Sequence, residues 1–242
     1  MTSPGVLIVG AGQAAAVAAR ALREGGFRGG ITMVGRECHK PYERPPLSKA
    51  VLVAAEEPRL DVLPQEVWVL GDIDLLNGSD AVDLDVAKRQ IRLASGQVLA
   101  YDMCLLATGG EPNALASAPA GHPHVHYMRT LEDARRLRVA LHGKPQVAIL
   151  GGGFLGLEIA HAAMSMGASV TVFERATSLL DRFLPPEASM WLESGLREAG
   201  ARLLLGASLG GIHSLPGGRI RLATDTGCLL YTSPSPRDQR GS

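Results

Sequence analysis

The chain has 242 residues, and its 24 basic and 24 acidic side chains give a formal net charge of zero. With no basic field, we expect neither a nucleic-acid partner nor binding to a membrane surface. No apolar run is long enough to span a bilayer, and the first residues lead into a predicted strand without the pattern of a secretory signal. Three cysteines without metal-ligand spacing suit a reducing cytoplasm.

A nucleotide-binding pattern begins at residue 6. Val6–Val9 predicts a buried strand, and the next six residues, Gly10 to Ala15, have the spacing G-x-G-x-x-A. In such a turn the first glycine bends the chain, the second lets backbone N–H groups approach a pyrophosphate, and the third small residue lets helix and strand pack closely. A helix over 14–23 and a strand over 31–34 complete a β-α-β unit. The residues expected at the dinucleotide are Gly10, Gly12, Ala14 and Ala15; a glycine-rich turn that binds nothing is the alternative.

The segment Pro41-Tyr42-Glu43-Arg44-Pro45-Pro46-Leu47-Ser48-Lys49 follows. It resembles the Y-x-R-P-P-L-S-K signature of FAD-dependent, NADH-linked ferredoxin reductases, in the pyridine nucleotide-disulfide oxidoreductase superfamily. The resemblance extends from Val6 to about Gly227. By itself, the pair Pro45-Pro46 predicts a stiff extended loop.

The resemblance implies roles for this loop. Arg44, with Pro45 beside it, would lie near the FAD pyrophosphate or adenine, and Lys49 would lie beside the isoalloxazine ring, where its charge stabilises the reduced flavin. A surface loop with two solvated charges is the alternative. In the family an acid directly follows the glycine that ends the second strand; this chain has Arg36 there, so we assign the FAD ribose contact to Glu37.

Residues 51–76 read as helical in part. Three short alternating segments then predict an antiparallel meander: 81–84, 90–93 and 97–101. The resemblance places the backbone of Ala81 at the FAD adenine. Residues 101–110 are similar to the family pattern Y-D-x-L-x-x-A-T-G, in which Thr108 and Gly109 would close over the dinucleotide.

Residues 111–123 are rich in Pro, Ala and Gly and predict a crossover between domains. On a strand His122, His124 and His126 would share a face, but no carboxylate or cysteine lies nearby, so no metal site is predicted. Residues 129–134 resemble the family motif R-T-L-x-D-A. Arg129 would reach the flavin nucleotide, with a surface arginine as the alternative, and Thr130 is predicted to cap a helix.

A second nucleotide-binding unit starts with Val147–Leu150, a predicted buried parallel strand. Its glycine turn has the spacing G-x-G-x-x-G, formed by Gly151, Gly153 and Gly156. A helix and the strand 169–173 follow and lead to Glu174. This acid would accept hydrogen bonds from a ribose 2′-OH and repel a 2′-phosphate, so the prediction is NAD rather than NADP.

The resemblance places Glu158 near the nicotinamide and Arg182 near an NAD phosphate or ribose. It implies a two-stage reaction, in which NADH delivers a hydride to the flavin and the reduced flavin passes single electrons to a ferredoxin-type iron–sulfur protein. Lys49 and Glu158 are the predicted catalytic residues. The related disulfide reductases need a cysteine pair soon after the first unit. Here that region holds only Cys38, and Cys104 lies in a predicted buried strand.

The predicted fold is α/β, with two Rossmann-like units and a small antiparallel meander. We expect an FAD-binding domain over 1–114 and a truncated NAD-binding domain over 115–227. Residues 228–238 read as the translation of a transposase adapter used to prepare DNA libraries, so we predict that 228–242 is an artefact; a disordered tail is the alternative. We expect such a fragment to bind FAD weakly and react poorly. The alternative functions are a non-catalytic nucleotide-binding fragment, a related NADH oxidase, or the NADH-oxidising half of a larger reductase.

Overall fold

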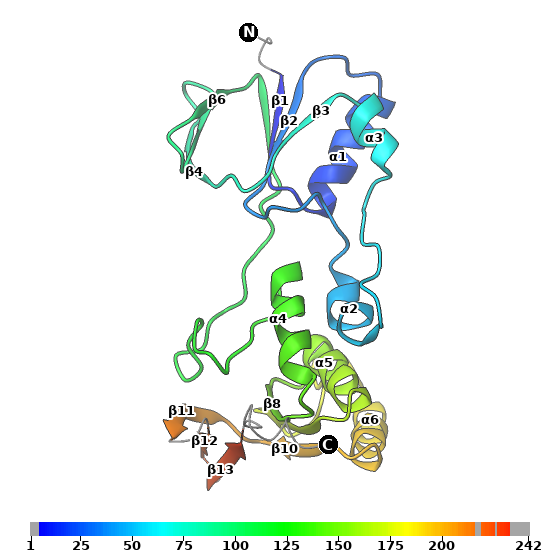
Figure 1. Ribbon diagram of the computed structural model, residues 1–242, viewed down its shortest axis with the longest axis vertical. Helices are drawn as coiled ribbons and strands as arrows, with labels where there is room; N and C mark the ends of the chain where they lie inside the picture. Colours follow the sequence, from blue (N-terminus) through cyan, green and yellow to red (C-terminus); the bar gives the residue numbers. More distant parts are fainter. Residues whose placement is uncertain (1–4, 216–218, 226, 233–242) are drawn as a thin grey trace. The chain divides into compact units, whose positions relative to one another are not determined.

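The computed structural model describes residues 5–215, 219–225 and 227–232. The chain forms two compact units (Figure 1). The first comprises Met1–Arg44 and Arg59–Glu111, and the second comprises Pro45–Pro58 and Pro112–Ser242. The chain therefore leaves the first unit for 14 residues, returns, and leaves it again after Glu111.

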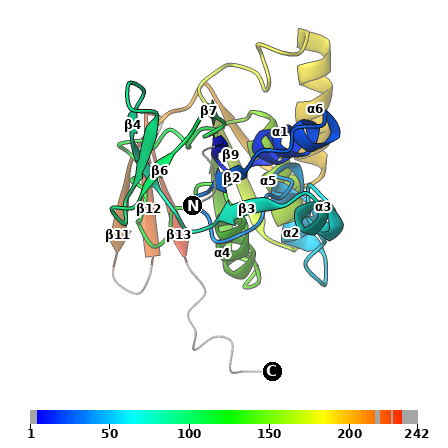
Figure 2. The same cartoon turned by 90° about the horizontal axis from the view of Figure 1, so that it is seen from above.

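The first unit contains a four-stranded parallel sheet in the order β3-β2-β1-β7. Its strands are β1 (Val6–Val9), β2 (Ile31–Val34), β3 (Ile73–Leu76) and β7 (Met103–Leu106). Two helices, α1 (Gln13–Glu24) and α3 (Gln65–Leu70), lie on one face, and the antiparallel strands β4 (Ala81–Asp85), β5 (Gln90–Leu93) and β6 (Val98–Ala100) lie on the other (Figures 1 and 2).

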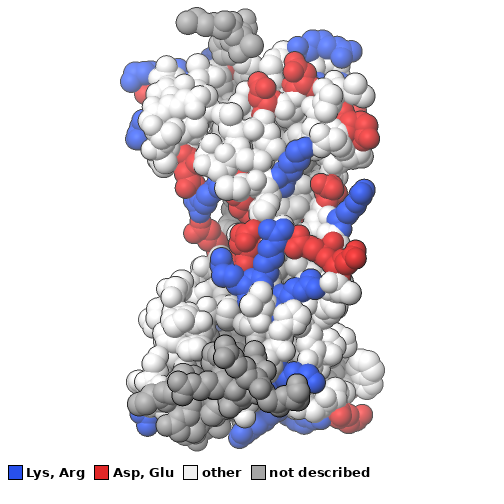
Figure 3. Space-filling model, in the orientation of Figure 1, with Lys and Arg blue, Asp and Glu red and all other residues white. Residues whose placement is uncertain are grey.

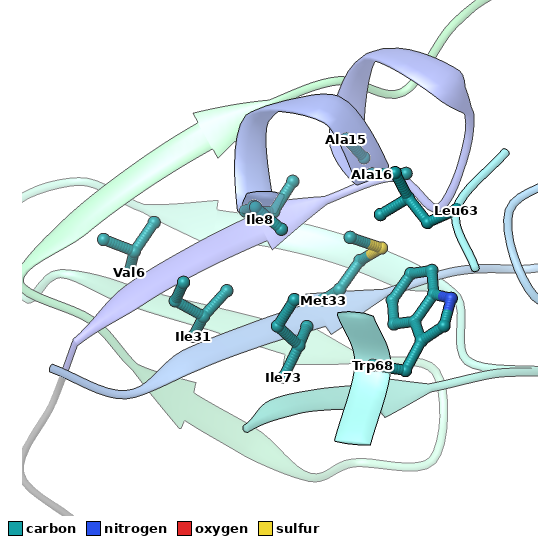
Figure 4. Packing of buried hydrophobic residues seen from close by; sticks show 10 residues of the cluster. Val6, Ile8, Ala15, Ala16, Ile31, Met33, Leu63, Trp68 and Ile73 are labelled. Carbon is teal, nitrogen blue, oxygen red and sulfur yellow. The ribbon is translucent and has the colours of Figure 1, made fainter. Parts of the chain in front are cut away.

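Alternation along β1 explains these two layers. Val6 and Ile8 belong to the apolar cluster on the helix side, whereas Leu7 and Val9 belong to the cluster on the meander side. Successive side chains of a strand point to opposite faces, so a continuous apolar run buries both. On the helix side the cluster includes Met33 and Trp68 (Figure 4). The α1 residues that face it are fully buried alanines, small enough to let the helix approach the sheet: Ala15, Ala16 and Ala19.

The second unit has the same plan. Its parallel sheet has the order β10-β9-β8, from β8 (Gln146–Leu150), β9 (Ser169–Glu174) and β10 (Arg202–Leu205). Helices α5 (Phe154–Ser165) and α6 (Pro186–Glu198) lie on the opposite side from the antiparallel strands β11 (Leu209–Leu215), β12 (Arg219–Thr224) and β13 (Gly227–Thr232) (Figures 1 and 2). Leu203 and Leu205 pack with leucines of α6, whereas Leu204 packs with the antiparallel strands.

Three further elements belong to the second unit. They are the 3-10 turn η1 (Pro45–Ser48) and the single-turn helix α2 (Ala50–Val53), which come from the first excursion of the chain, and α4 (Leu131–Leu141), which precedes β8. The structure confirms the predicted fold class of two Rossmann-like units with an antiparallel meander. Within the described residues, no helix has the length and apolar character needed to cross a bilayer.

Several local predictions were wrong. Pro45 and Pro46 begin a 3-10 turn rather than an extended loop. Helices α2 and α3 confirm that residues 51–76 are helical in part, but two strands were not predicted: β3 over 73–76 and β11. Cys104 lies on the edge strand β7. Met103 and Leu106 of the same strand are more than half exposed, so β7 is not buried. β8 is also only partly buried, with Ile149 as its single buried residue.

β13 covers residues 227–232 and pairs with β12, so its bounds overlap the segment from Cys228 that we excluded from fold prediction. Residues 233–242 lie outside the described part of the chain. The origin of residues 228–242 stays a prediction.

Candidate functional site

The glycine turn of the first unit can accommodate a phosphate. Gly10 has a positive φ of 118°, and a Cβ there would overlap the carbonyl group of Ala107 just beyond β7. Gly12 is the N-cap of α1, makes no side-chain cap hydrogen bond, and would have no atom within 4 Å of an added Cβ. The first-turn N–H groups of α1 therefore adjoin open space that an anion can enter.

The small residues around this turn have different surroundings. Ala15 is fully buried against the sheet, whereas Ala14 is exposed on the first turn of α1. Thr108 follows Ala107, and its backbone nitrogen lies 3.1 Å from the position of a Cβ on Gly10. Gly109 has a φ of 71°, which few other residues adopt. The predicted A-T-G segment therefore adjoins the first glycine turn.

Glu37 and Arg44 form one cluster. Oε1 of Glu37 accepts a hydrogen bond from Nη2 of Arg44 at 2.6 Å, and Oε2 accepts one from the hydroxyl group of Tyr42. The Arg44 guanidinium also lies 5.1 Å from the centre of the Tyr42 ring. The ionic pair fixes both predicted FAD contacts relative to the end of β2.

Arg36 is engaged elsewhere in the same unit. Its Nε donates to Asp80 at 2.5 Å, and Nη1 donates to Glu111. The hydrogen bond to Asp80, followed by that to Glu111, raises the pKa of Arg36. Ala81 follows Asp80 directly and pairs with Leu93 at the start of β4. The carboxylates of Asp80 and Glu111 therefore neutralise Arg36, which stands at the position where the family pattern has an acid.

Lys49 and Glu158 meet within the second unit. Nζ of Lys49 lies 2.6 Å from Oε1 of Glu158 on α5, and the hydroxyl group of Ser48 donates to Oε2 at 2.5 Å. Burial raises the pKa of Glu158, but hydrogen bonds from Lys49 and Ser48 outweigh this and hold it below its ordinary value. The carboxyl group is consequently ionised at neutral pH. Lys49 is 53% exposed, so a ligand can reach the pair.

The second glycine turn repeats the features of the first. Gly151 has a φ of 107°, and a Cβ on Gly156 would overlap the Gly151 carbonyl oxygen. Gly153 is the N-cap of α5 without a side-chain cap, and the space around it is open. Glu174 lies beside this turn, because its Oε2 accepts the Gly152 N–H at 2.7 Å and its Oε1 accepts the Ala176 N–H at 2.8 Å.

Sequence reasoning missed the requirement for Gly152. A Cβ on Gly152 would overlap the Leu179 side chain, which is fully buried beneath the turn. The run of three glycines was the available signal, but the fingerprint assigns no role to its middle position. Leu179 is itself held by Glu193 of α6, which is 8% exposed and accepts the Leu179 N–H at 3.0 Å.

Arg182 and Arg129 both belong to the second unit. Arg182 is exposed in the turn segment after β9. The backbone N–H of Arg129 donates to Asp133 at 3.0 Å, next to the predicted cap of α4. That cap is confirmed, because Thr130 and Asp133 form a reciprocal capping box.

The three alternating histidines do not lie on a strand. The rings of His122 and His124 are 5.8 Å apart in a region of turns, so the shared-face argument fails. No cluster of metal-ligating side chains occurs in the described residues.

A cavity of about 710 Å³ opens beside β8. Its walls include Val147 and Ile149 of β8, Leu137 of α4 and Leu222 of β12. Although Gly151 and Gly153 reach its edge, the lining is mainly apolar. The cavity therefore suits an apolar group better than a pyrophosphate.

Comparison with known proteins identifies the family. The family described as Pyridine nucleotide-disulphide oxidoreductase matches residues 4–229. The chain belongs to this family. The ferredoxin–NAD(+) reductase component of the p-cumate 2,3-dioxygenase system of Pseudomonas putida is 40% identical over 218 residues, which cover 90% of this chain and 54% of that protein. Rubredoxin–NAD(+) reductase of Pseudomonas putida is 36% identical over 88% of this chain and 55% of its own length.

A solved structure of the covalent putidaredoxin reductase–putidaredoxin complex is also similar, with a TM-score of 0.88 and 30% identity. The match covers 97% of this chain and 58% of that one. The chain thus spans about half the length of the curated relatives it matches. The comparisons confirm the resemblance identified from the glycine turns and the Pro41–Lys49 segment.

Proposed function

We propose that this chain is the dinucleotide-binding part of a flavoprotein reductase that transfers a hydride from NADH to FAD and then passes electrons to a ferredoxin-type iron–sulfur protein. The observation that carries the proposal is the duplicated glycine turn. A positive-φ glycine directly follows β1 in the first unit and β8 in the second, and the next helix, α1 or α5, begins at an uncapped glycine beside open space. Two such turns in one chain suit an enzyme that handles two dinucleotides.

In the first unit we assign the pyrophosphate of FAD to the turn at Gly10 and Gly12. Ala14, Ala15, Ala81, Thr108 and Gly109 are the proposed neighbours of the nucleotide in this unit. Pro45 and Arg129 of the second unit stay proposed FAD contacts by the resemblance alone. Glu37 is the proposed ribose acceptor. Its two oxygens already accept one hydrogen bond each from Tyr42 and Arg44, but a carboxylate offers about four acceptor positions. Glu37 can therefore accept a ribose hydroxyl without losing Arg44.

In the second unit we assign NAD to the turn at Gly151, Gly153 and Gly156. Glu174 is ordered by two backbone N–H groups and retains acceptor positions for ribose hydroxyls. Its negative charge would repel a 2′-phosphate, which favours NAD over NADP. Arg182 is the proposed partner of a phosphate or ribose oxygen.

At the reacting end the proposed residues are Lys49 and Glu158. A bound flavin would supply the hydride acceptance and single-electron release that side chains do not provide. Lys49 contributes a positive charge that Glu158 holds in place, and Glu158 in turn accepts a hydrogen bond from Ser48. Because its pKa is lowered, Glu158 acts as an ionised hydrogen-bond acceptor that orients its partners rather than as a proton donor at neutral pH.

The proposed partner is an iron–sulfur protein because the relatives named above are reductases of ferredoxin and rubredoxin, and one similar structure contains putidaredoxin. The face in Figure 3 carries intermixed acidic and basic side chains. The cysteine usage supports a cytoplasmic location, as the described thiols of Cys38 and Cys104 are both free.

Anaerobic titration with NADH tests this function. The chain is saturated with FAD, and loss of the flavin absorbance is followed for wild type, Lys49→Met and the control Lys88→Met, whose lysine pairs only locally with Asp85. We expect NADH to bleach the flavin, with Lys49→Met slowing the reaction by at least about tenfold and Lys88→Met leaving it unchanged. Bound flavin that NADH does not bleach would contradict hydride transfer from NADH to FAD by this chain. Binding of NADH without any FAD would support a nucleotide-binding module instead.

A further inference from the structure

Two arginines of α4 hold the segment that carries Lys49. Nη1 of Arg138 donates to the carbonyl oxygen of Val51 at 3.2 Å, and Nη2 donates to the carbonyl oxygens of Ala54 at 2.5 Å and Ala55 at 3.1 Å. These carbonyls lie in and just after α2. The last carbonyls of a helix lack helical partners, and a cation there is favourable. The planar guanidinium group can bind several carbonyls at once, which an ammonium group matches poorly.

The hydrogen bonds of α2 connect this contact to Lys49. The N–H groups of Leu52 and Val53 both donate to the carbonyl oxygen of Lys49, at 3.0 and 3.3 Å. Val51 and Leu52 are fully buried. Since α2 has a single turn, fixing its C-terminal end also fixes the backbone of Lys49.

Arg135 binds the end of the same segment. Its Nε and Nη2 donate to the two oxygens of Glu57 at 2.8 and 2.7 Å, and Nη1 donates to Glu132. Arg135 and Glu57 are 40% and 37% exposed, so solvent screens this pair. Arg138 is therefore expected to contribute more than Arg135.

We propose that Arg138, assisted by Arg135, is a positioning residue that holds Lys49 against Glu158. Its functional consequence rests on the proposed roles of Lys49 and Glu158 in the reductase. Arg138 belongs to α4, the helix that begins within the R-T-L-E-D-A motif, and it contacts residues more than 80 positions earlier in the chain. The motif thus begins a helix that orders the Pro45–Pro58 segment of the second unit.

The test compares Arg138→Met and Arg138→Lys with a matched control, Arg136→Met. Arg136 lies on the same helix, is 65% exposed and pairs with Asp133 within that helix. The first readout is amide hydrogen exchange of the whole chain without cofactors. Arg138→Met should speed exchange in residues 50–57 by about tenfold or more, Arg138→Lys should give a smaller increase, and Arg136→Met should give none.

The second readout is the pKa of the Glu158 carboxyl group, followed by ¹³C NMR and assigned with Glu158→Gln. Lys49→Met removes the partner that lowers this pKa, so the value should rise. Arg138→Met should raise it in the same direction, with no further rise in the Lys49→Met, Arg138→Met double variant. This readout needs no flavin, so it tests the positioning role even if the proposed function fails.

Unchanged exchange in residues 50–57 would overturn the proposal. So would a Glu158 pKa that responds to Lys49→Met but not to Arg138→Met, because Arg138 would then stabilise α2 without placing Lys49. If Arg138→Met does not fold, Arg138→Lys decides by the same two readouts. In a flavin-loaded chain, NADH should bleach the single variant Arg138→Met about tenfold more slowly than wild type. The double variant should be bleached no more slowly than Lys49→Met alone. If the wild-type chain does not bind FAD, the proposed function is refuted, but the positioning role of Arg138 is not.

Discussion

Replacing Glu174 tests how the second glycine turn is ordered. Its carboxylate accepts the N–H groups of Gly152 and Ala176 at 2.7 and 2.8 Å. Hydrogen bonds to a charged group contribute about 1.5–3 kcal/mol each, and partial exposure of Glu174 favours the lower value. Glu174→Gln keeps one acceptor oxygen and should cost about 1.5 kcal/mol, whereas Glu174→Ala loses both and should cost about 3 kcal/mol.

These costs are measurable as melting temperatures. For a chain of this size 1 kcal/mol corresponds to about 2–4 °C, so Tm should fall by about 3–6 °C for Glu174→Gln and by about twice that for Glu174→Ala. Glu198→Ala is the control, because its carboxylate accepts only the exposed Ser194 hydroxyl. NADH titration should show at least about tenfold weaker binding to Glu174→Ala. A Tm and an NADH affinity equal to those of Glu198→Ala would refute the reasoning.

Three smaller predictions follow. Thr130→Ala removes the N-cap of α4 and should cost about 1 kcal/mol in urea unfolding, and an unchanged midpoint would contradict the capping box. The pKa of Glu158 in the folded chain lies below its ordinary value of 4.5, so the ionised carboxylate stabilises the fold above pH 4.5. This stabilisation is lost as the pH falls through the pKa of the folded state. The Tm gap between wild type and Glu158→Gln should accordingly shrink from about pH 6 to about pH 3, and a constant gap would be inconsistent with the Lys49 pair. Alkylation mapped by mass spectrometry should modify exposed Cys38 before Cys104, because burial raises the pKa of the Cys104 thiol; the reverse order would contradict the placement of β7.

Local sequence predicted the two β-α-β units because their strands, glycine turns and helices are contiguous. The elements that were missed depend on distant partners. β3 is a four-residue strand whose identity comes from parallel pairing with β2. β11 contains Gly210 and Gly211, which interrupt the alternation expected of a strand, and it forms because it pairs with β12. For Pro45 and Pro46 the ring fixes φ but not ψ, so a 3-10 turn was as compatible with the sequence as an extended loop.

The candidate site shows the same division. The second glycine turn and Glu174 are adjacent in the fold because a fingerprint of fixed spacing places them together. The pairing of Ser48 and Lys49 with Glu158 joins residues about 110 positions apart, and no periodicity reports such a contact. The two carboxylates around Arg36 were also unpredictable, because they come from the start of the meander and from the end of the first unit.

The most direct test of the central claim is a paired binding measurement. FAD and NADH are titrated separately into wild type, Gly12→Val and Gly153→Val, with circular dichroism to confirm that each variant is folded. A side chain at either glycine would occupy the open space that we assign to a pyrophosphate. We expect Gly12→Val to lose FAD binding and keep NADH binding, and Gly153→Val to do the reverse. Loss of both ligands from one folded variant, or of neither ligand from both variants, would contradict two separate dinucleotide sites.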